Sequence, residues 1–379
     1  MIPLRLRTFL NGLAASVSML ALHGAGADDG FAPLFNGRDL SGWVNVNCAP
    51  ETFTVRDGMI HCDGIPTGAL RTVRQYENFE LELEWRHLKA GGNAGVFIWA
   101  GPMPAVGQPF LRAIEVQVLD HGYGKSDWFT THGDVFPIHG SRMKPFSPSN
   151  GDRSFPKEMR SHGAPEWNRY RIVATNGVLR LSVNGAEVSG GTGCTWRKGY
   201  IALESEGGQV DWRHLRIREL PSTGAGPADS APEAEHWRSL YDGRGLRGWT
   251  PSPGAEAVWA AEDWTLRSAA KSASSAVLRG PVCSGATRMV FDWKWDAEPA
   301  SKVPPVSLSV AGGEPSALPP MPKARSKDWN RLELRRVEGR FELTLNGEPA
   351  GDVAVPAGDF TPILVPGPVL TRLSSLFVR

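Results

Sequence analysis

The chain contains two related halves, and this repeat is the feature that most constrains its fold. The segment LFNGRDLSGW at 34–43 recurs as LYDGRGLRGW at 240–249, an offset of 206 residues. The triplet Trp-Asn-Arg at 167–169 recurs at 329–331, an offset of only 162 residues. Self-similarity of this kind is typical of a duplicated structural unit, so we expect two domains with one fold.

The second copy is the shorter one. Trp85 aligns with Trp295 at an offset of 210 residues, so the copies stay in step up to this point. The second half therefore lacks 48 residues, which correspond to a block between about residues 99 and 166 of the first half. A copy that keeps the scaffold but loses one block is expected to fold without an active site of its own.

Alternating apolar and charged residues predict β-strands. FELELEWR at 79–86 and IEVQV at 114–118 alternate at every position, as a strand with one buried face does. The same alternation covers 170–173, 179–183 and 212–217.

The turns and the lack of helical patterns complete the prediction of fold class. Asn184-Gly185 and Asn346-Gly347 are typical of type I′ hairpins, and Thr175-Asn176-Gly177 also predicts a turn between strands. We find no amphipathic helix pattern longer than two turns. An all-β fold is therefore expected, with two tandem jelly-roll β-sandwiches of which the second is shortened.

The expected domain limits follow from one segment of low complexity. Residues 221–235 (PSTGAGPADSAPEAE) contain no Leu, Ile, Val or aromatic residue, which predicts a flexible linker. The two β-sandwich domains are expected at 30–220 and 236–379.

Residues 1–27 have the pattern of a secretory signal peptide. Arg5 and Arg7 precede an apolar stretch, and Ala25-Gly26-Ala27 fits a cleavage site. The apolar stretch is shorter than the ~20 residues that span a bilayer. The sequence therefore predicts export to the periplasm or the extracellular space, and no transmembrane segment.

Charge and cysteine content limit the partners and the cross-links. The formal net charge of +1 excludes partners recognised through bulk positive charge, such as nucleic acids. Export would permit disulfides. Cys48 and Cys62 flank a turn at Asp57-Gly58 and could face each other across a hairpin.

The block absent from the second copy holds the residues with the most chemistry. Glu115 and Gln117 are two positions apart on a predicted strand, so they share one face. Asp120 and His121 follow where the strand ends and a glycine-rich loop begins, a common place for functional groups. A solvated strand face would show the same pattern, so both interpretations remain open.

Other residues have a structural and a functional interpretation. Trp99 is either a core residue or a platform on which a sugar stacks. Arg86 ends a strand and fits a rim ion pair as well as a ligand contact. The alternating glutamates at 80, 82 and 84 are expected on an exposed face.

The sequence resembles the bacterial 3-keto-disaccharide hydrolase family, also described as 3-keto-glucoside 1,2-lyase/3-keto-2-hydroxy-glucal hydratase domains. The resembling segments span nearly all of 34–220 and are LFNGRDLSGW (34–43), FTVRDGMIHC (53–62), GALRT (68–72), NFELELEWR (78–86), GGNAGVFIWA (91–100), EVQVLD (115–120), APEWNRYRI (164–172), VNG (183–185) and GYIALESEGGQVDWRHLRIREL (199–220). The resemblance implies a concanavalin-like (laminin-G-like) jelly roll in an exported protein.

The resemblance implies that a 3-keto-disaccharide or other glycoside is cleaved by elimination and hydration. Such chemistry needs a base near C2, an acid near the glycosidic oxygen, and donors for the enolate. The expected catalytic residues are Glu115, Asp120 and His121. The expected substrate-binding residues are Arg86, Asn93, Trp99, Gln117, His139 and Glu204. The chemistry also admits a divalent metal, held by Glu115, Asp120, His121 and His139.

Two other functions use the same fold. One is a non-catalytic carbohydrate-binding β-sandwich, since jelly rolls serve both purposes. The other is a laminarinase-like glycoside hydrolase, which needs two carboxylates flanking the scissile bond. Gln117 stands where a second acid beside Glu115 would be expected, and this argues against the two-carboxylate mechanism.

Overall fold

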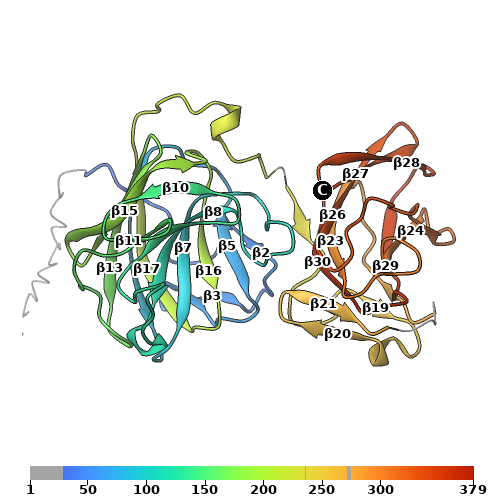
Figure 1. Cartoon of the computed structure of the whole chain (residues 1–379), viewed down its shortest axis with the longest axis horizontal. Coiled ribbons are helices and arrows are strands. Elements are labelled where there is room, and N and C mark those ends of the chain that lie inside the picture. Colours follow the sequence, from blue (N-terminus) through green and yellow to red (C-terminus); the bar gives the residue numbers. More distant parts are fainter. Residues whose placement is uncertain (1–28, 235, 271–274) are drawn as a thin grey trace, which may run out of the picture.

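The computed structural model describes residues 29–234, 236–270 and 275–379, and strands account for nearly all regular structure in these ranges (Figure 1). The described helical segments are three short 3-10 turns, η1 (His121–Tyr123), η2 (Pro227–Asp229) and η3 (Ala255–Ala257). No helix among these residues is long and apolar enough to cross a membrane. The predicted signal peptide lies outside the described residues.

The first half is a sandwich of two antiparallel sheets. We call the eight-stranded sheet, in the order β11-β12-β9-β8-β7-β16-β5-β2, the site sheet. Its strands are β2 (Trp43–Val46), β5 (Gly68–Thr72), β7 (Asn93–Ala100), β8 (Ala113–Leu119), β9 (Val135–Ile138), β11 (Ser149–Asn150), β12 (Arg153–Ser154) and β16 (Tyr200–Ser205).

We call the nine-stranded sheet of the first half the ladder sheet. Its order is β10-β15-β14-β13-β6-β17-β4-β3, and β1 pairs with β17. Its strands are β1 (Ala32–Pro33), β3 (Phe53–Arg56), β4 (Met59–Cys62), β6 (Phe79–His87), β10 (Arg142–Pro145), β13 (Asn168–Thr175), β14 (Val178–Val183), β15 (Ala186–Thr195) and β17 (Val210–Glu219).

The second half repeats this plan with fewer strands. One sheet has the order β20-β21-β30-β23-β26-β27-β28 with β18 on β30, and the other β19-β22-β29-β24-β25. The strands are β18 (Arg238–Ser239), β19 (Thr250–Pro251), β20 (Trp259–Glu262), β21 (Thr265–Ser268), β22 (Leu278–Arg279), β23 (Arg288–Trp295), β24 (Val306–Val310), β25 (Ser316–Ala317), β26 (Asn330–Val337), β27 (Arg340–Leu345), β28 (Glu348–Ala354), β29 (Phe360–Leu364) and β30 (Thr371–Val378).

The strand orders confirm the predicted fold class of two tandem β-sandwiches, the second shortened. β23, β26 and β30 hold the places that β6, β13 and β17 hold in the ladder sheet. The second half has only β25 in the place of β8 and has no strands corresponding to β9–β12 within the described residues. The lost block is therefore one edge of the site sheet (β9, β11 and β12) and the edge strand β10 of the ladder sheet, together with their loops.

The local predictions rest on turn chemistry that the structure shows directly. Asn184 and Gly185 join β14 to β15 with φ values of +46° and +93°. Asn346 and Gly347 repeat this geometry in the second half, with φ of +52° and +86°. Left-handed backbone at both positions is the requirement of a type I′ turn, so the Asn-Gly pairs are hairpin turns as predicted.

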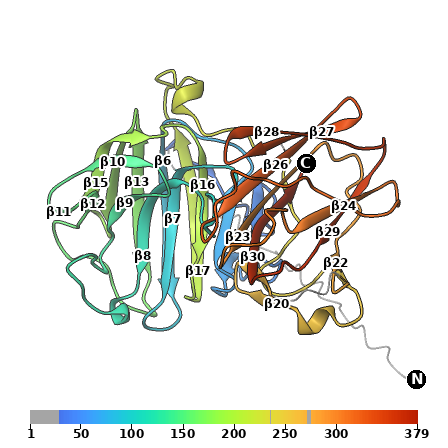
Figure 2. The ribbon, with the colours of Figure 1, turned by 45° about the vertical axis from the view of Figure 1, so that its right-hand side comes forward.

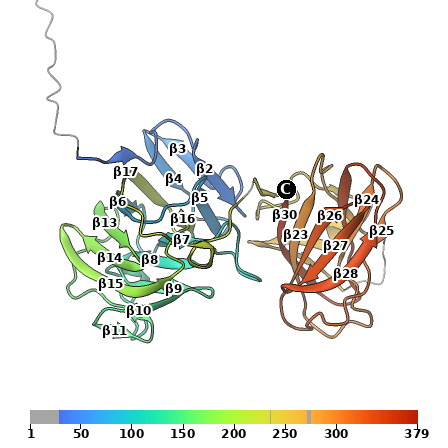
Figure 3. The same cartoon turned by 90° about the horizontal axis from the view of Figure 1, so that it is seen from above.

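Each half has its own core, and a smaller apolar cluster joins the two halves. The cluster combines residues of the site sheet, such as Phe97 and Tyr200, with Phe377 on β30 and with Trp237. β30 lies on the side of the second half that faces the first half (Figures 1 and 3). Figure 2 shows the same two sandwiches from a second direction. We propose 30–220 and 236–379 as the two domains.

The described part of the segment 221–235 runs along the first half. The Glu77 carboxylate accepts the backbone N–H of Thr223 at 2.9 Å and of Ala225 at 3.1 Å. The backbone N–H of Ala234 donates to the Tyr200 hydroxyl at 2.7 Å, and Ala234 is buried. These contacts hold the described part of the segment against the first half, and its flexibility as a linker stays a prediction.

The four cysteines are free and buried in the structure. Cys62 ends the β3–β4 hairpin, where its register partner is Phe53. Burial raises the pKa of the Cys62 thiol to about 12. Burial also raises the pKa of the Cys48 thiol, so both thiols remain protonated at neutral pH.

Candidate acid–base site

Glu115 and Gln117 project from the middle of the site sheet. Ile114, Val116 and Val118 lie in the core of the first half, so the two polar side chains face away from it. Both are nevertheless buried. The interpretation as a solvated strand face is therefore wrong, because other parts of the protein cover these side chains.

Glu204 meets Glu115 across a glycine. β8 and β16 flank β7, and Gly95 of β7 lies between the two glutamates. A Cβ built on Gly95 would lie 2.8 Å from Oε2 of Glu204 and 3.1 Å from Oε1 of Glu115. The two carboxylates thus face each other over the space of one missing methyl group.

Glu206 adds a third carboxylate just beyond the end of β16. Its Oε2 accepts a hydrogen bond from Nδ2 of Asn93. Oδ1 of Asn93 in turn accepts a hydrogen bond of 2.9 Å from Nε2 of Gln117. We call Glu115, Glu204 and Glu206 the carboxylate cluster. Asn93 and Gln117, both expected at the substrate, are its amide neighbours.

Burial raises the pKa values of all three members of the carboxylate cluster. Removal from water, with a smaller contribution from the Glu206 charge, raises the pKa of Glu115 to about 8. Burial also raises the pKa of Glu206 to about 7. The pKa of Glu204 is raised well above its ordinary value by burial and by Glu115, and neither Glu204 oxygen has a hydrogen-bond partner. The cluster therefore holds protons at neutral pH and can both donate and accept them.

A cation borders the carboxylate cluster on the β9–β12 side. Nη1 of Arg153 lies 3.0 Å from Oδ2 of Asp134 and 3.4 Å from Oε1 of Gln117. The guanidinium also lies over the Phe136 ring, 3.4 Å from its centroid. Phe136 is the register partner of Glu115. Arg153 therefore places fixed positive charge at the edge of the site.

Asp120 shapes the loop that follows β8. Its Oδ2 accepts the backbone N–H of Gly91 at 2.8 Å and of Gly122 at 2.7 Å, and its Oδ1 accepts that of Ala164 at 2.6 Å. Burial would raise its pKa, but these donors outweigh it and the pKa is lowered. These three hydrogen bonds hold three segments together, and Asp120 as a catalytic residue stays a prediction.

His121 belongs to a separate polar group. Its Nε2 lies 2.9 Å from Oγ of Ser161, and Nδ1 of His132 lies 3.1 Å from the same oxygen. The two imidazole rings are 4.9 Å apart. No hydrogen bond that the structure shows joins this group to the carboxylate cluster, so His121 as a catalytic residue stays a prediction.

The metal set expected from the sequence is not assembled. Asp120 is occupied by backbone donors, and His139 lies at the end of β9, stacked on Phe110 with ring centroids 6.0 Å apart. The described residues contain no group of three His, Cys, Asp or Glu side chains placed to hold a metal ion. Among the described residues, Glu115, Asp120, His121 and His139 therefore do not form the expected metal site.

Two further expectations are corrected by the faces on which the residues lie. Arg86 leaves the ladder sheet on its outer face, where its Nη2 bonds Oδ2 of Asp211 at 2.9 Å. The site sheet and the core separate it from Glu115. Trp99 is 1% exposed, and its Nε1 donates to the Glu77 carbonyl at 2.8 Å. Its φ of +52° interrupts the alternation of β7 and turns the ring into the core.

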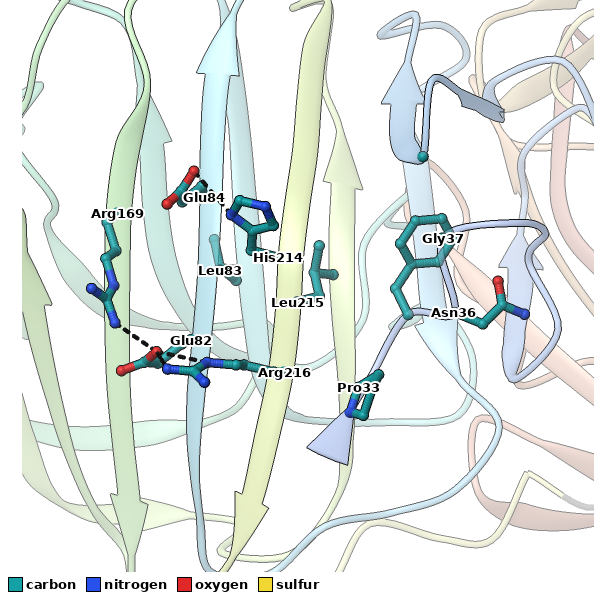
Figure 4. Close-up of a pocket in the computed structure, with 12 residues that line it drawn as sticks. Pro33, Asn36, Gly37, Glu82, Leu83, Glu84, Arg169, His214, Leu215 and Arg216 are labelled. Atoms are coloured by element: carbon teal, nitrogen blue, oxygen red, sulfur yellow. Dashed lines mark hydrogen bonds and ion pairs between the residues drawn. The ribbon is translucent and has the colours of Figure 1, made fainter. Parts of the chain in front are cut away.

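A cavity of about 760 Å3 opens on the ladder sheet, on the other side of the sandwich (Figure 4). Glu82 in its wall accepts hydrogen bonds of 2.7 Å from both Arg169 and Arg216. Burial would raise the pKa of Glu82, but the two arginines lower it. The glutamates expected on an exposed face (80, 82 and 84) thus point outward beneath arginines and form ion pairs with them. Their pKa values are lowered, whereas those of the carboxylate cluster are raised.

Sequence reasoning missed Glu206. The signal was present in the segment Leu203-Glu204-Ser205-Glu206, where two acids share one face of a strand. What the sequence did not reveal was that β16 lies beside β7, which brings Glu204 within reach of Glu115.

The jelly-roll domain that carries the carboxylate cluster matches a family of carbohydrate-active domains. Residues 30–218 match the model of the 3-keto-alpha-glucoside-1,2-lyase-like domain. This first domain belongs to that family, as the resemblance implied.

Individual relatives match the same part of the chain. A 3-keto-disaccharide hydrolase of Bacteroides thetaiotaomicron is 25% identical over 230 residues, 51% of this chain and 79% of the relative. A crystal structure from Parabacteroides distasonis ATCC 8503 matches with 22% identity and a TM-score of 0.37, over 51% of this chain and 94% of that one. The carbohydrate-binding module CBM66 of Bacillus subtilis matches with 9% identity and a TM-score of 0.34, over 47% and 96%.

Proposed function

We propose that the protein is an exported enzyme that cleaves 3-keto-glycosides by elimination followed by hydration, with net hydrolysis. The observation that carries the proposal is the pair Glu115–Glu204, two buried carboxylates that meet over Gly95 and retain protons at neutral pH. The family of the first domain and its hydrolase relative support the substrate class.

The reaction needs one proton taken and one proton given at neighbouring atoms. The carbonyl at C3 makes the C2 proton acidic, so an ionised carboxylate removes it and its electron pair forms an enolate. The enolate then expels the glycosidic oxygen from C1, and that oxygen takes a proton from a carboxylic acid. Water adds across the new double bond, with hydroxyl at C1 and a proton at C2.

The carboxylate cluster can supply both roles because its members titrate together. With the pKa of Glu115 near 8 and that of Glu206 near 7, a protonated and an ionised carboxyl coexist around neutral pH. The amide groups of Asn93 and Gln117, fixed by their mutual hydrogen bond, are placed to orient sugar hydroxyls. Arg153 offers a cation at the margin for the developing enolate.

The decisive experiment incubates the purified full chain with a 3-keto-disaccharide and with the same disaccharide unoxidised, each with and without a chelator. We expect cleavage of the keto form alone, unaffected by the chelator. Glu115→Gln and Glu204→Gln should each reduce turnover at least about tenfold, whereas Glu187→Gln, which changes an ion-paired surface carboxylate, serves as the control. Full activity in both site variants would refute the site.

The juxtaposition of Glu115 and Glu204 specifically favours a second candidate, a two-carboxylate glycoside hydrolase. In that mechanism one carboxyl protonates the leaving oxygen and the other acts as nucleophile or base. The sequence argument against it no longer holds, because the second acid comes from β16 instead of position 117. Cleavage of the unoxidised disaccharide would establish this candidate, and binding without cleavage would establish a carbohydrate-binding module.

Export is a separate part of the proposal and rests on residues 1–27. We expect the mature protein to begin at Asp28 in the periplasm or the extracellular space. N-terminal sequencing of the protein from a producing cell measures this, and a chain that still begins at Met1 in that fraction would contradict it.

A further inference from the structure

The second domain docks beside the strand that carries Glu204. The backbone N–H of Thr67 donates a hydrogen bond of 2.7 Å to Oδ1 of Asp263, across the two domains. Thr67 directly precedes β5, in which Ala69 is the register partner of Glu204. Asp263, in the β20–β21 turn, therefore lies at the end of the strands that lead to the carboxylate cluster.

The second domain also holds the connection between β7 and β8. This segment, 101–112, reaches from the first domain towards the second (Figures 1 and 3). The backbone N–H of Gly107 donates to Oδ2 of the buried Asp292 at 3.1 Å. Nη2 of Arg331 donates to the Pro104 carbonyl at 2.8 Å while its guanidinium bridges Asp292. The strands carrying Gly95 and Glu115 are thus tied to the second domain at their connection.

A pair of tryptophans stands at these two contacts. Trp264 follows Asp263 in the turn, and its ring centroid lies 5.5 Å from that of Trp329, at an interplanar angle of 35°. Trp329 lies against Gly107 so closely that a Cβ at Gly107 would collide with the ring. Both tryptophans are half-buried and neither lies in the core of the second domain.

Trp329 has different neighbours from the tryptophan at the equivalent position of the first domain. Its counterpart in the first domain is Trp167. The Trp167 ring is covered by two guanidinium groups, from Arg86 at 4.6 Å and Arg213 at 3.8 Å. Trp329 instead meets a second indole beside the segment that connects the strands of the site.

We propose that the second domain completes the substrate site, with Asp263 and the Trp264–Trp329 pair binding the sugar unit attached to the 3-keto ring. The inference rests on the proposed function, because it takes the carboxylate cluster as the reacting centre. Indole rings stack on the apolar faces of sugars, and a carboxylate accepts hydrogen bonds from sugar hydroxyls. Asp263 acts on the cluster electrostatically as well: after burial, its charge further raises the pKa of Glu206.

Kinetics with two substrates test the proposal on the full chain. A 3-keto-disaccharide carries the second sugar, and the 3-keto form of a methyl glucoside lacks it. Trp264→Ala should raise KM for the disaccharide about three- to tenfold and leave KM for the methyl glucoside unchanged. Trp264→Phe keeps an aromatic face and should restore most of the loss. Trp167→Ala, the same change at the counterpart position, should affect neither KM.

Equal effects on both substrates, no effect of Trp264→Ala, or an equal effect of Trp167→Ala would overturn the proposal. A binding assay separates its failure from failure of the proposed function. If the wild type cleaves neither substrate, the proposed function fails, and cellobiose and maltose are then titrated against the quenching of tryptophan fluorescence. Weaker binding by Trp264→Ala than by wild type and Trp167→Ala supports sugar binding by the Trp264–Trp329 pair. Equal binding by all three proteins refutes it.

Discussion

Glu115 keeps its proton in the folded protein at pH values where the unfolded chain has lost it. Its pKa is about 8 in the fold against an ordinary 4.5, so unfolding releases a proton between these values and stability falls as pH rises. Glu115→Gln removes the contribution of Glu115 to this dependence. We expect the Tm of the variant to match wild type near about pH 4 and to exceed it by a few degrees at pH 8, as thermal scans across this range will show. A variant that is less stable than wild type at pH 8 would contradict a buried, protonated Glu115.

Asp120 has the opposite relation to pH. Its lowered folded pKa means that it stabilises the fold above its ordinary pKa of 3.8 and that this stability is lost as pH falls through the folded value. Asp120→Asn should lower the free energy of unfolding by about 1–3 kcal/mol at pH 7, because one acceptor oxygen is replaced by a donor.

Denaturant titrations at pH 7 and pH 3 measure the effect of Asp120→Asn, and the difference from wild type should shrink at the lower pH. The pH profile of turnover should keep its shape, since Asp120 holds backbone groups. If Asp120→Asn instead loses one side of the pH–turnover curve while its stability is unchanged, Asp120 takes part in catalysis.

At the scale of a strand, β7 lets the two acids approach each other because Gly95 has no side chain. Gly95→Ala would put a methyl group within 2.8 Å of Glu204 and 3.1 Å of Glu115, so the carboxylates must move apart. We expect turnover to fall at least about tenfold with a far-UV spectrum that stays unchanged, because Gly95 has no left-handed backbone to lose. Gly226→Ala, where a new Cβ meets nothing within 4 Å, is the control, and equal activity of both variants would contradict the role of this gap.

Strands were the most predictable part of the molecule, because alternation reports which side chains share a face. Glu115 and Gln117 are together for that reason. Alternation does not report which of the two sheets a strand joins, so Arg86 was expected in the site and lies on the ladder sheet. It also fails at a bulge, where the left-handed Trp99 turns an outward position inward. Glu206 and Gly95 matter through neighbours distant in sequence, and no local pattern marks such neighbours.

For the whole molecule, the sequence repeat predicted two sandwiches and the shortening of the second, but not how they dock. The docking of the two domains depends on close contacts at single residues, and the contact at Gly107 leaves the least space. A side chain there would meet the Trp329 ring, and the backbone already has a φ of +66°.

We expect Gly107→Ala to loosen the contact between the domains, so that protease cleaves between 221 and 235 faster and the radius of gyration increases. Limited proteolysis and solution scattering measure both. Gly42→Ala provides the control, since Gly42 also has a positive φ of +87° but open space around it. Identical behaviour of the two variants would show that the contact does not hold the domains together.

The repeat places two versions of one ion pair in a single chain. Arg169 bonds Glu82 on an open face, where the arginine side chain is 53% exposed, whereas Arg331 bonds Asp292 beneath the segment 101–112 and is 13% exposed. One NMR sample therefore contains both an exposed and a covered arginine of this ion pair. The ratio of hydrogen-exchange rates for the two guanidinium groups would report how often that segment lifts from the second domain, with each molecule serving as its own reference and no substitution required.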